Sequence, residues 1–277
     1  MNRKSLDVGL ALSLSCFLAG AAPSYSVELL SPATQLGEKR VHSEVYYRHL
    51  AEQDLNIELG NSGTIRVKNN TYSTTSNTEL AAEGSGNGVM AKLTFQPFDF
   101  GVQYYMVGGL SHYELSIPSG SFSNRFQTDG PGYVIGGGIK YTLVPYTIVS
   151  PAVSIDLSAT HSRYNLTKFA SGDGKVTGDT GELLTVLEFQ GALTASKKFS
   201  FKLGENQSYI DPYLGVKVIR TRTNLDESGT GAHFSGTRTG VAPFFGFRFK
   251  PFNYEGFVIE GSLLSEVSAS LGITLGF

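Results

Sequence analysis

Apolar and polar residues alternate along most of the chain after residue 60, in short segments that are separated by turn residues. Successive side chains of a β-strand point to opposite faces, so this alternation predicts strands with one apolar and one polar face. No helical period of comparable length occurs after residue 26. Ten strands are expected, at residues 64–68 (with an earlier start near Leu55 as the alternative), 88–98, 100–115, 132–144, 146–160, 182–196, 209–222, 239–250, 255–264 and 268–277.

The final segment, SASLGITLGF at residues 268–277, shows the alternation most clearly. Small or polar residues occupy every second position, and the apolar positions between them are Ala269, Leu271, Ile273, Leu275 and Phe277. About ten residues is the length of a tilted strand that crosses a bilayer. The segment resembles the C-terminal signal strand of bacterial outer-membrane β-barrels, in which the barrel assembly machinery reads a final Phe after alternating apolar residues. The resemblance implies that this machinery is a partner during biogenesis.

The expected connections fall into two classes. Short turns, or a link of medium length, are expected at residues 97–99, 144–145, 197–208 and 251–254. Longer polar segments are expected between them, at residues 69–87, 116–131, 161–180 and 223–236, and only the last hairpin, near residues 264–267, is short on that side. Short turns at one end and long loops at the other are typical of outer-membrane barrels. The pattern therefore predicts an all-β fold, a transmembrane up-and-down antiparallel β-barrel of ten strands, with eight or twelve strands as the alternatives.

Aromatic residues gather near the expected short turns. Aromatic rings settle at the boundary between membrane and water, because one end of the ring is apolar and the other tolerates water. We therefore expect a periplasmic aromatic girdle that consists of Phe95, Phe98, Phe100, Tyr141, Tyr146, Tyr209, Tyr213, Phe249, Phe252, Tyr254 and Phe257. The alternative is the ordinary enrichment of aromatic residues in strands.

Charged residues within the expected strands fall mostly on the face opposite the apolar one. This interior set consists of Arg66, Lys92, Lys140, Asp156, Glu188, Lys217, Arg248 and Glu260. A cationic side chain on the lipid face costs roughly 2–4 kcal/mol at the middle of the bilayer, so we expect these residues to face the lumen. Glu114, Arg220 and Arg222 break the pattern, but they lie near the outer rim, where that cost falls. Buried charges need partners or water, so the set predicts lumenal ion pairs and not a wide pore.

The N-terminus is expected to be removed. Residues 1–26 have the features of a secretory signal, with Arg3 and Lys4 before an apolar core and cleavage near Ala22 or Ser26. Residues 27–54 are expected to form an N-terminal periplasmic segment of uncertain structure, and residues 55–277 the barrel; the alternative is that residues 41–59 contribute to the first strand.

Composition restricts the location of the protein. Cys16 is the only cysteine and lies inside the expected signal; its flanks are a poor lipidation motif, so a lipoprotein is disfavoured. The mature chain would then contain no thiol, which suits an oxidising periplasm. No run of 18 apolar residues follows residue 30, and the net charge of −2 gives no basic surface for nucleic acid. We expect the outer membrane as the location, with membrane lipid and lipopolysaccharide as partners.

Motifs for catalysis or cofactors are weak. None of the five histidines lies two residues from an aspartate, so the pairs of omptin proteases are missing. His233 and Ser235 have the His-x-Ser spacing of outer-membrane phospholipases and lipid A deacylases, and a serine needs such a base to become nucleophilic. Gly236 replaces the Asn that usually follows in those families, and the flanking residues are typical of a loop. We expect no catalytic, cofactor or metal site.

The chain resembles the small OmpA-like outer-membrane β-barrels over residues 55–277, without a periplasmic domain. This resemblance implies a monomeric, non-enzymatic surface protein with a structural role or with contacts made by its extracellular loops. Three alternatives remain: a narrow ion channel, a lipid hydrolase that uses His233 and Ser235, and a soluble lipocalin-like barrel with its apolar faces inside.

Overall fold

The computed structural model describes residues 32–33, 40–59, 64–67, 70–73, 78–98, 101–119, 122–170, 176–204, 206–226, 233–251 and 255–276. Nearly all of these residues lie in antiparallel β-strands. Ten strands form the wall of a barrel: β1 (Val41–Leu59), β4 (Thr78–Phe95), β5 (Val102–Ser119), β7 (Gly132–Val144), β8 (Ala152–Ala170), β9 (Val176–Ser196), β11 (Asn206–Asp226), β12 (His233–Lys250), β13 (Glu255–Ser262) and β14 (Glu266–Gly276).

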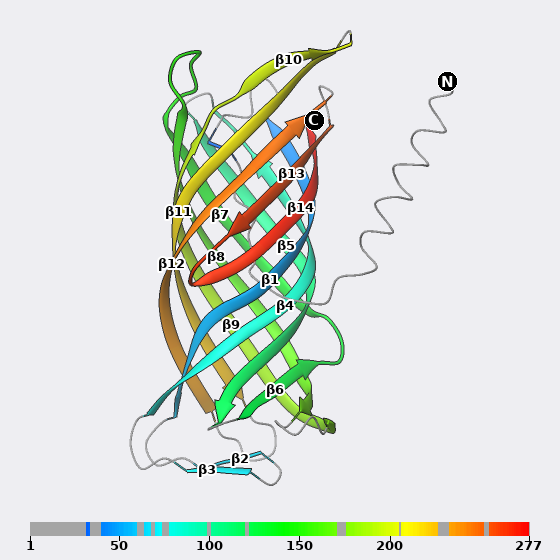
Figure 1. Ribbon diagram of the computed structural model, residues 1–277, viewed down its shortest axis with the longest axis vertical. Helices are drawn as coiled ribbons and strands as arrows, with labels where there is room; N and C mark the ends of the chain where they lie inside the picture. Colours follow the sequence, from blue (N-terminus) through cyan, green and yellow to red (C-terminus); the bar gives the residue numbers. More distant parts are fainter. Residues whose placement is uncertain are drawn as a thin grey trace, which may run out of the picture.

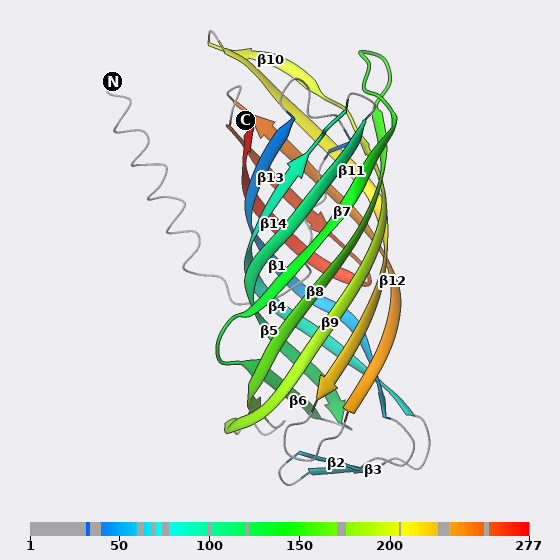
Figure 2. The ribbon, with the colours of Figure 1, turned by 180° about the vertical axis from the view of Figure 1, so that it is seen from behind.

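Each wall strand pairs with the next one along the chain, and β14 closes the ring against β1 (Figures 1 and 2). The closing register runs from His42 opposite Gly276 to Gln53 opposite Glu266. The chain is therefore an up-and-down β-barrel of ten antiparallel strands, as its alternation predicts.

The two ends of the barrel differ (Figure 1). One end carries the short connections and β10 (Phe199–Leu203), which pairs with the start of β11. The other end carries β2 (Thr64–Val67) and β3 (Asn70–Ser73), a separate two-stranded sheet, and β6 (Phe122–Thr128), which pairs with β5 and β8. Short turns face the periplasm in outer-membrane barrels. We call these the periplasmic end and the outer end.

The expected first strand is wrong. Residues 64–67 form β2, which pairs only with β3, and the first wall strand is instead β1. Residues 41–54 therefore belong to the barrel and not to a separate periplasmic segment. The alternation of β1 is hard to see in the sequence because a bulge between Leu50 and Gln53 shifts the faces by one residue. The expected signal at residues 1–26 lies outside the described residues.

Most wall strands are longer than expected. Part-way along such a strand the apolar face and the polar face change places, and the expected strand ends near that point. On β8, Ile155 and Leu157 are exposed on the outside and Asp156 is buried inside. Further along the same strand, Arg163 is exposed on the outside, whereas Tyr164 and Leu166 are buried inside. The faces keep their directions, and only their polarity changes.

The same exchange occurs on the neighbouring strands. On β5, Tyr104 and Met106 are exposed on the outside, whereas Tyr113 and Leu115 are buried inside beyond His112. We call the part with an apolar exterior the membrane section. The outer extension is the part beyond it, which begins near His112 on β5, His161 on β8, Arg220 on β11 and Thr239 on β12. The expected long loops at residues 69–87, 116–131, 161–180 and 223–236 consist largely of this extension.

The β13–β14 hairpin ends at the boundary between the two sections. Leu263 and Leu264 are exposed at its tip, where the backbone N–H of Leu263 donates to Pro243. Beyond the tip, β1 pairs directly with β12 through Glu58 and Ser235. A small pocket lies at this seam, beside an ion pair of 3.1 Å between Arg238 and Asp54.

Candidate functional site: the barrel interior and its outer seal

The interior of the membrane section is charged. Seven of the eight residues expected there have side chains that are at most 6% exposed: Lys92, Lys140, Asp156, Glu188, Lys217, Arg248 and Glu260. Further buried charged residues that the sequence reasoning missed are Glu44, Arg48, Asp211, Lys250 and Glu266, together with Glu182 in the outer extension. The buried charged set among the described residues thus contains six basic and seven acidic residues, so it is nearly neutral.

Arg66 does not belong to this set. It lies on β2, opposite Thr71 of β3, in the sheet that is separate from the barrel wall. Its assignment to the lumen was wrong. The segment TIRVK is short, and its alternation of apolar and polar residues does not distinguish a wall strand from a hairpin outside the ring.

Glu266 is the centre of one charged cluster. Its Oε1 forms ion pairs with Arg48 from β1 and with Lys217 Nζ from β11, the latter at 2.8 Å. The hydroxyls of Ser262 and Ser268 donate to the same oxygen at 2.9 and 2.8 Å. The side chains of Glu266 and Lys217 are fully buried, and that of Arg48 is 2% exposed. Three strands that are distant in sequence are therefore joined at one carboxylate.

A second charged cluster lies nearer the periplasmic end. Arg248 forms an ion pair of 2.5 Å with Glu44, which connects β12 to β1. The Tyr105 hydroxyl donates to Asp156 at 2.5 Å, and the Lys92 ammonium lies 3.9 Å from the centre of the Tyr105 ring. Buried charges are tolerated when they are paired and hydrogen-bonded in this way.

Part of the N-terminal segment lies inside the barrel. Ala33 is fully buried, and the Lys140 ammonium donates to the carbonyl of Pro32. The Thr142 hydroxyl donates to the carbonyl of Ala33 at 3.4 Å. Residues 32–33 therefore occupy interior space next to β7, on the periplasmic side of the Glu266 cluster.

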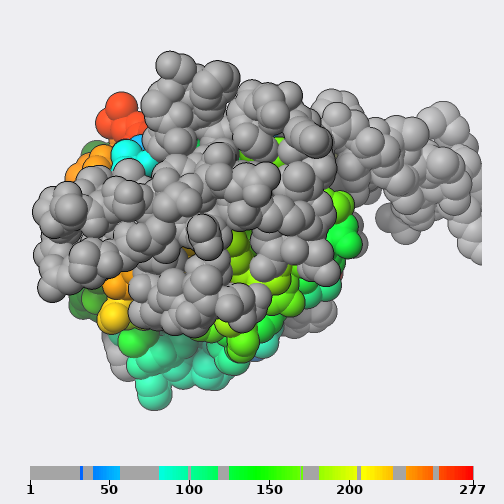
Figure 3. Space-filling model, turned by 90° about the horizontal axis from the view of Figure 1, so that it is seen from below, coloured from blue at the N-terminus to red at the C-terminus, as the bar shows by residue number. Residues whose placement is uncertain are grey.

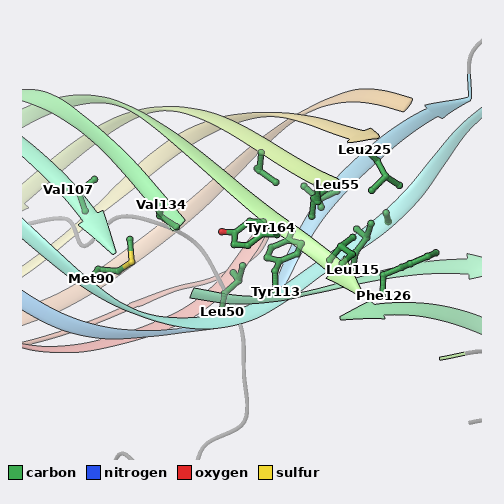
Figure 4. Close-up of a cluster of buried hydrophobic side chains, with 14 of the residues drawn as sticks. Leu50, Leu55, Met90, Val107, Tyr113, Leu115, Phe126, Val134, Tyr164 and Leu225 are labelled. Carbon is green, nitrogen blue, oxygen red and sulfur yellow. The ribbon is translucent and has the colours of Figure 1, made fainter. Parts of the chain in front are cut away.

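The interior of the outer extension is mostly apolar, and its buried polar residues include Ser162, Glu182 and Thr223. Its buried apolar residues belong to one hydrophobic cluster that includes Leu50, Leu55, Tyr113, Leu115, Phe126, Tyr164, Leu166, Leu184 and Leu225, most of which are labelled in Figure 4. The rings of Tyr113 and Tyr164 are stacked, with centroids 4.8 Å apart. Figure 3 views this end along the barrel, with described residues of β8 and β9 in yellow-green. We call this cluster the outer seal.

The exterior of the membrane section is largely apolar, with the polar Ser43 and His49 of β1 among its exceptions. Exposed examples are Val89, Met106, Ile139, Leu157, Leu193, Leu214 and Phe245. In the final strand, Ala269, Leu271, Ile273 and Leu275 are all exposed on this face, and Phe277 lies outside the described residues. A barrel with an apolar exterior and a charged interior spans a membrane, and barrels of this kind are located in the outer membrane.

Several residues of the expected aromatic girdle lie on this exterior near the periplasmic end. Phe95, Phe98, Tyr141 and Tyr146 are exposed, and Phe249 and Phe257 are partly exposed on outward-facing positions. The side chains of Phe100, Phe252 and Tyr254 lie outside the described residues.

Two tyrosines do not belong to the expected girdle. Tyr213 is only 3% exposed and its hydroxyl donates to Glu260 at 2.9 Å inside the barrel. Tyr209 occupies the same inward parity on β11, with the Lys198 ammonium 3.9 Å from its ring centre. They were assigned by their nearness to a turn, whereas the face of the strand decides where a ring points.

His233 and Ser235 lie at the start of β12 and not in a loop. The register places His233 opposite Asp226 of β11, and Ser235 opposite Asn224. Both positions are in the outer extension, beyond the boundary at Thr239. Among the described residues, no group of three or more His, Cys, Asp or Glu is arranged to hold a metal ion, and no helix is long and apolar enough to cross a membrane.

The chain matches no protein-family model and no curated protein sequence. Among solved structures, the translocator domain of the autotransporter NalP from Neisseria meningitidis is 7% identical, with a TM-score of 0.41 over 88% of this chain and 90% of that chain. The transport unit of the autotransporter AIDA-I from Escherichia coli is 8% identical, with a TM-score of 0.39 over 88% and 93%. The toluene transporter TbuX from Ralstonia pickettii is 8% identical, with a TM-score of 0.32 over 87% and 90%. At these values the similarities carry no argument about what the chain does.

Proposed function

We propose that this protein is a closed, non-conducting barrel of the outer membrane that acts as a surface protein. Its contacts with other molecules are made by the outer extension and the loops that the extension carries. The observation that supports this proposal most directly is the outer seal, because this hydrophobic cluster lies between the charged interior of the membrane section and the outer end. The charged side chains of the interior then fill the barrel and do not form a path for ions.

The membrane section supports the same proposal. Ten strands enclose an interior that side chains can fill, unlike the wide lumen of porins with 16–18 strands. Here the interior is occupied by paired charges, by Tyr105 and Tyr213, and by residues 32–33. Ions that crossed this section would have to displace Arg48, Lys217 or Arg248 from buried carboxylates.

We predict that the purified, folded protein gives no current steps in planar lipid bilayers. We expect the outer seal to stop ions, because the energetic cost of placing an ion in an apolar interior is high. Conductance would be recorded at 1 M KCl over both signs of voltage, with a known porin added afterwards to show that the bilayer reports channels. Discrete steps that scale with the number of inserted barrels would contradict the closed barrel and favour the narrow channel.

We also predict that single cysteines report the orientation of the barrel. Glu83→Cys, at an exposed position in the outer extension of β4, should react with a membrane-impermeant maleimide on intact cells. Lys202→Cys, exposed on β10, should react only after the outer membrane has been permeabilised. The mature chain is expected to have no cysteine of its own, so each label reports one site. Labelling of Lys202→Cys alone on intact cells would reverse the assigned ends.

We further propose that the protein is a monomer with a role similar to that of OmpA-like barrels. Its proposed partners are the assembly machinery, membrane lipid and lipopolysaccharide. We propose no catalytic role. His233 and Ser235 belong to the outer extension, for which we propose a role in surface contacts.

A further inference from the structure

We propose that the outer wall carries a binding site for the phosphate groups of lipid A, formed by Arg163 of β8 and by Arg220 and Arg222 of β11. All three side chains are exposed and outward-facing, at or just beyond the boundary between the membrane section and the outer extension. We call these three residues the arginine patch. The site deepens the proposed function, because it rests on the barrel spanning the outer membrane with the assigned ends.

The register brings the arginine patch together on β8 and β11, the two strands that flank β9. Arg222 lies opposite Leu187 of β9, and Leu187 lies opposite His161 of β8. Arg163 is two residues beyond His161 on the same face, opposite Thr185. Neighbouring strands are about 4.8 Å apart, so β8 and β11 are separated by roughly 10 Å across β9. Long arginine side chains from both strands can therefore reach one ligand above β9.

The electrostatics of this wall favour an anion. No carboxylate occupies an outward position of β8 over residues 153–165, of β9 over residues 183–195 or of β11 over residues 212–224. The opposite wall differs, because Glu52 of β1 and Glu83 of β4 are exposed on the outer extension there. The charge of the exterior is therefore separated, with the arginine patch on the β8–β9–β11 side and Asp226 as the first outward carboxylate further out on β11. Figure 2 shows β8 and β9 side by side on this wall.

The surface next to the arginine patch fits the acyl chains of the same lipid. Directly towards the periplasmic end lie Leu157, Phe189, Val216, Val218 and Leu193, all exposed on the lipid face. Guanidinium groups bind phosphate oxygens in pairs of parallel hydrogen bonds. Cations at the headgroup level above an apolar wall match a lipid with phosphates on its headgroup. The outer leaflet holds lipid A at this level, so we commit to lipid A and not to an anionic phospholipid.

Two other basic residues of the outer extension supply a matched control. Arg125 forms an ion pair of 3.6 Å with Glu114, and Lys168 forms one of 2.5 Å with Asp129. The hydrogen bond from Lys168 lowers the pKa of the Asp129 carboxyl, as expected for a cation that is already engaged. Removing these two cations changes the net charge by the same amount as removing two arginines of the patch.

The test measures binding of lipid A to the full-length folded protein in detergent by native mass spectrometry. Bisphosphorylated lipid A should bind the native protein, and the double variant Arg220→Gln/Arg222→Gln should weaken this binding by about tenfold or more, because charge-assisted bonds to phosphate are lost. The control Arg125→Gln/Lys168→Gln should bind as the native protein does. All variants must keep the heat-modifiable migration of a folded barrel, which the exposed positions predict.

Three outcomes would overturn the site. They are equal loss of binding in the control variant, unchanged binding in the patch variant, and equal binding of dephosphorylated lipid A. Equal binding of phosphatidylglycerol would overturn the choice of lipid A as the ligand. The cysteine labelling described above is independent of this measurement, so a failed site with correct labelling leaves the closed surface barrel in place.

Discussion

Replacement of Glu266 by glutamine will destabilise the barrel more than any other single neutralisation of a buried charge. The substitution keeps the volume but removes the negative charge that pairs with both Arg48 and Lys217, and it leaves these two cations buried. Breaking a buried ion pair by removing one partner costs about 3–5 kcal/mol. The midpoint of urea unfolding in lipid vesicles, read from heat-modifiable migration, should fall accordingly, and less protein should reach the outer membrane.

Two further variants show whether the buried charge is the cause. Glu52→Gln changes the same chemical group at an exposed position of β1, and its midpoint should equal that of the native protein. Adding Lys217→Met to Glu266→Gln removes one of the two cations that have lost the Glu266 carboxylate, so it should restore part of the lost stability. If Glu266→Gln unfolds at the native midpoint, the cluster contributes little and the interior must be stabilised by packing.

The sequence predicted the barrel well where the strands cross the membrane. In β12 and β14 the apolar positions, such as Phe245, Phe247, Leu271 and Ile273, recur every second residue without interruption. A lipid face demands this regularity, because a charge on it is costly. The same regularity placed Lys92, Lys140, Lys217 and Glu260 on the interior face, where the structure has them.

The sequence predicted β1 poorly, for two physical reasons. Its interior face carries His42, Glu44 and Arg48, and its exterior face includes the polar Ser43 and His49, so the contrast between faces is weak. The bulge after Leu50 then moves Gln53 and Leu55 to the interior. Because β1 was missed, two members of the charged clusters, Glu44 and Arg48, were missed with it.

Glu266 was missed for a different reason. It is the first residue of β14, directly after the tight turn at Leu264, whose φ is 76°. From the sequence it resembles an exposed turn residue in a short hairpin. Only the closure of the ring, which brings β1 and β11 to the same place, shows that its carboxylate is fully buried.

The outer extension was hidden by the change in polarity along each strand. On β5, the apolar positions are even-numbered up to Leu110 and odd-numbered from Tyr113 onwards. Such a change of phase ends a strand when periodicity alone is considered. In the structure the strand continues without a bulge against β4, and it is the environment of its outer face that changes from lipid to water. The outer seal is therefore the ordinary apolar core of a water-exposed barrel. It continues a membrane section in which the apolar face is outside and the charged face is inside.

Three lysine substitutions on β8 test this exchange of faces directly. Leu157→Lys, on the exterior of the membrane section, should destabilise the barrel by roughly 2–4 kcal/mol, because the ammonium group would face lipid. Leu166→Lys, fully buried in the outer seal, should also destabilise it, because the ammonium group would lie in an apolar interior. Asn165→Lys, exposed on the outer extension, should change the free energy of unfolding by less than about 0.5 kcal/mol.

The pattern of the three results distinguishes a membrane barrel from a soluble one. In a soluble barrel Leu157 would face water, so Leu157→Lys would be neutral, as Asn165→Lys is, while Leu166→Lys would still be damaging. In the membrane barrel both leucine variants lose stability and only the asparagine variant does not. Because all three positions lie on one strand, differences in strand propensity or assembly order affect them alike. A neutral Leu157→Lys in lipid vesicles would therefore contradict the membrane section, and with it the lipid A site above that section.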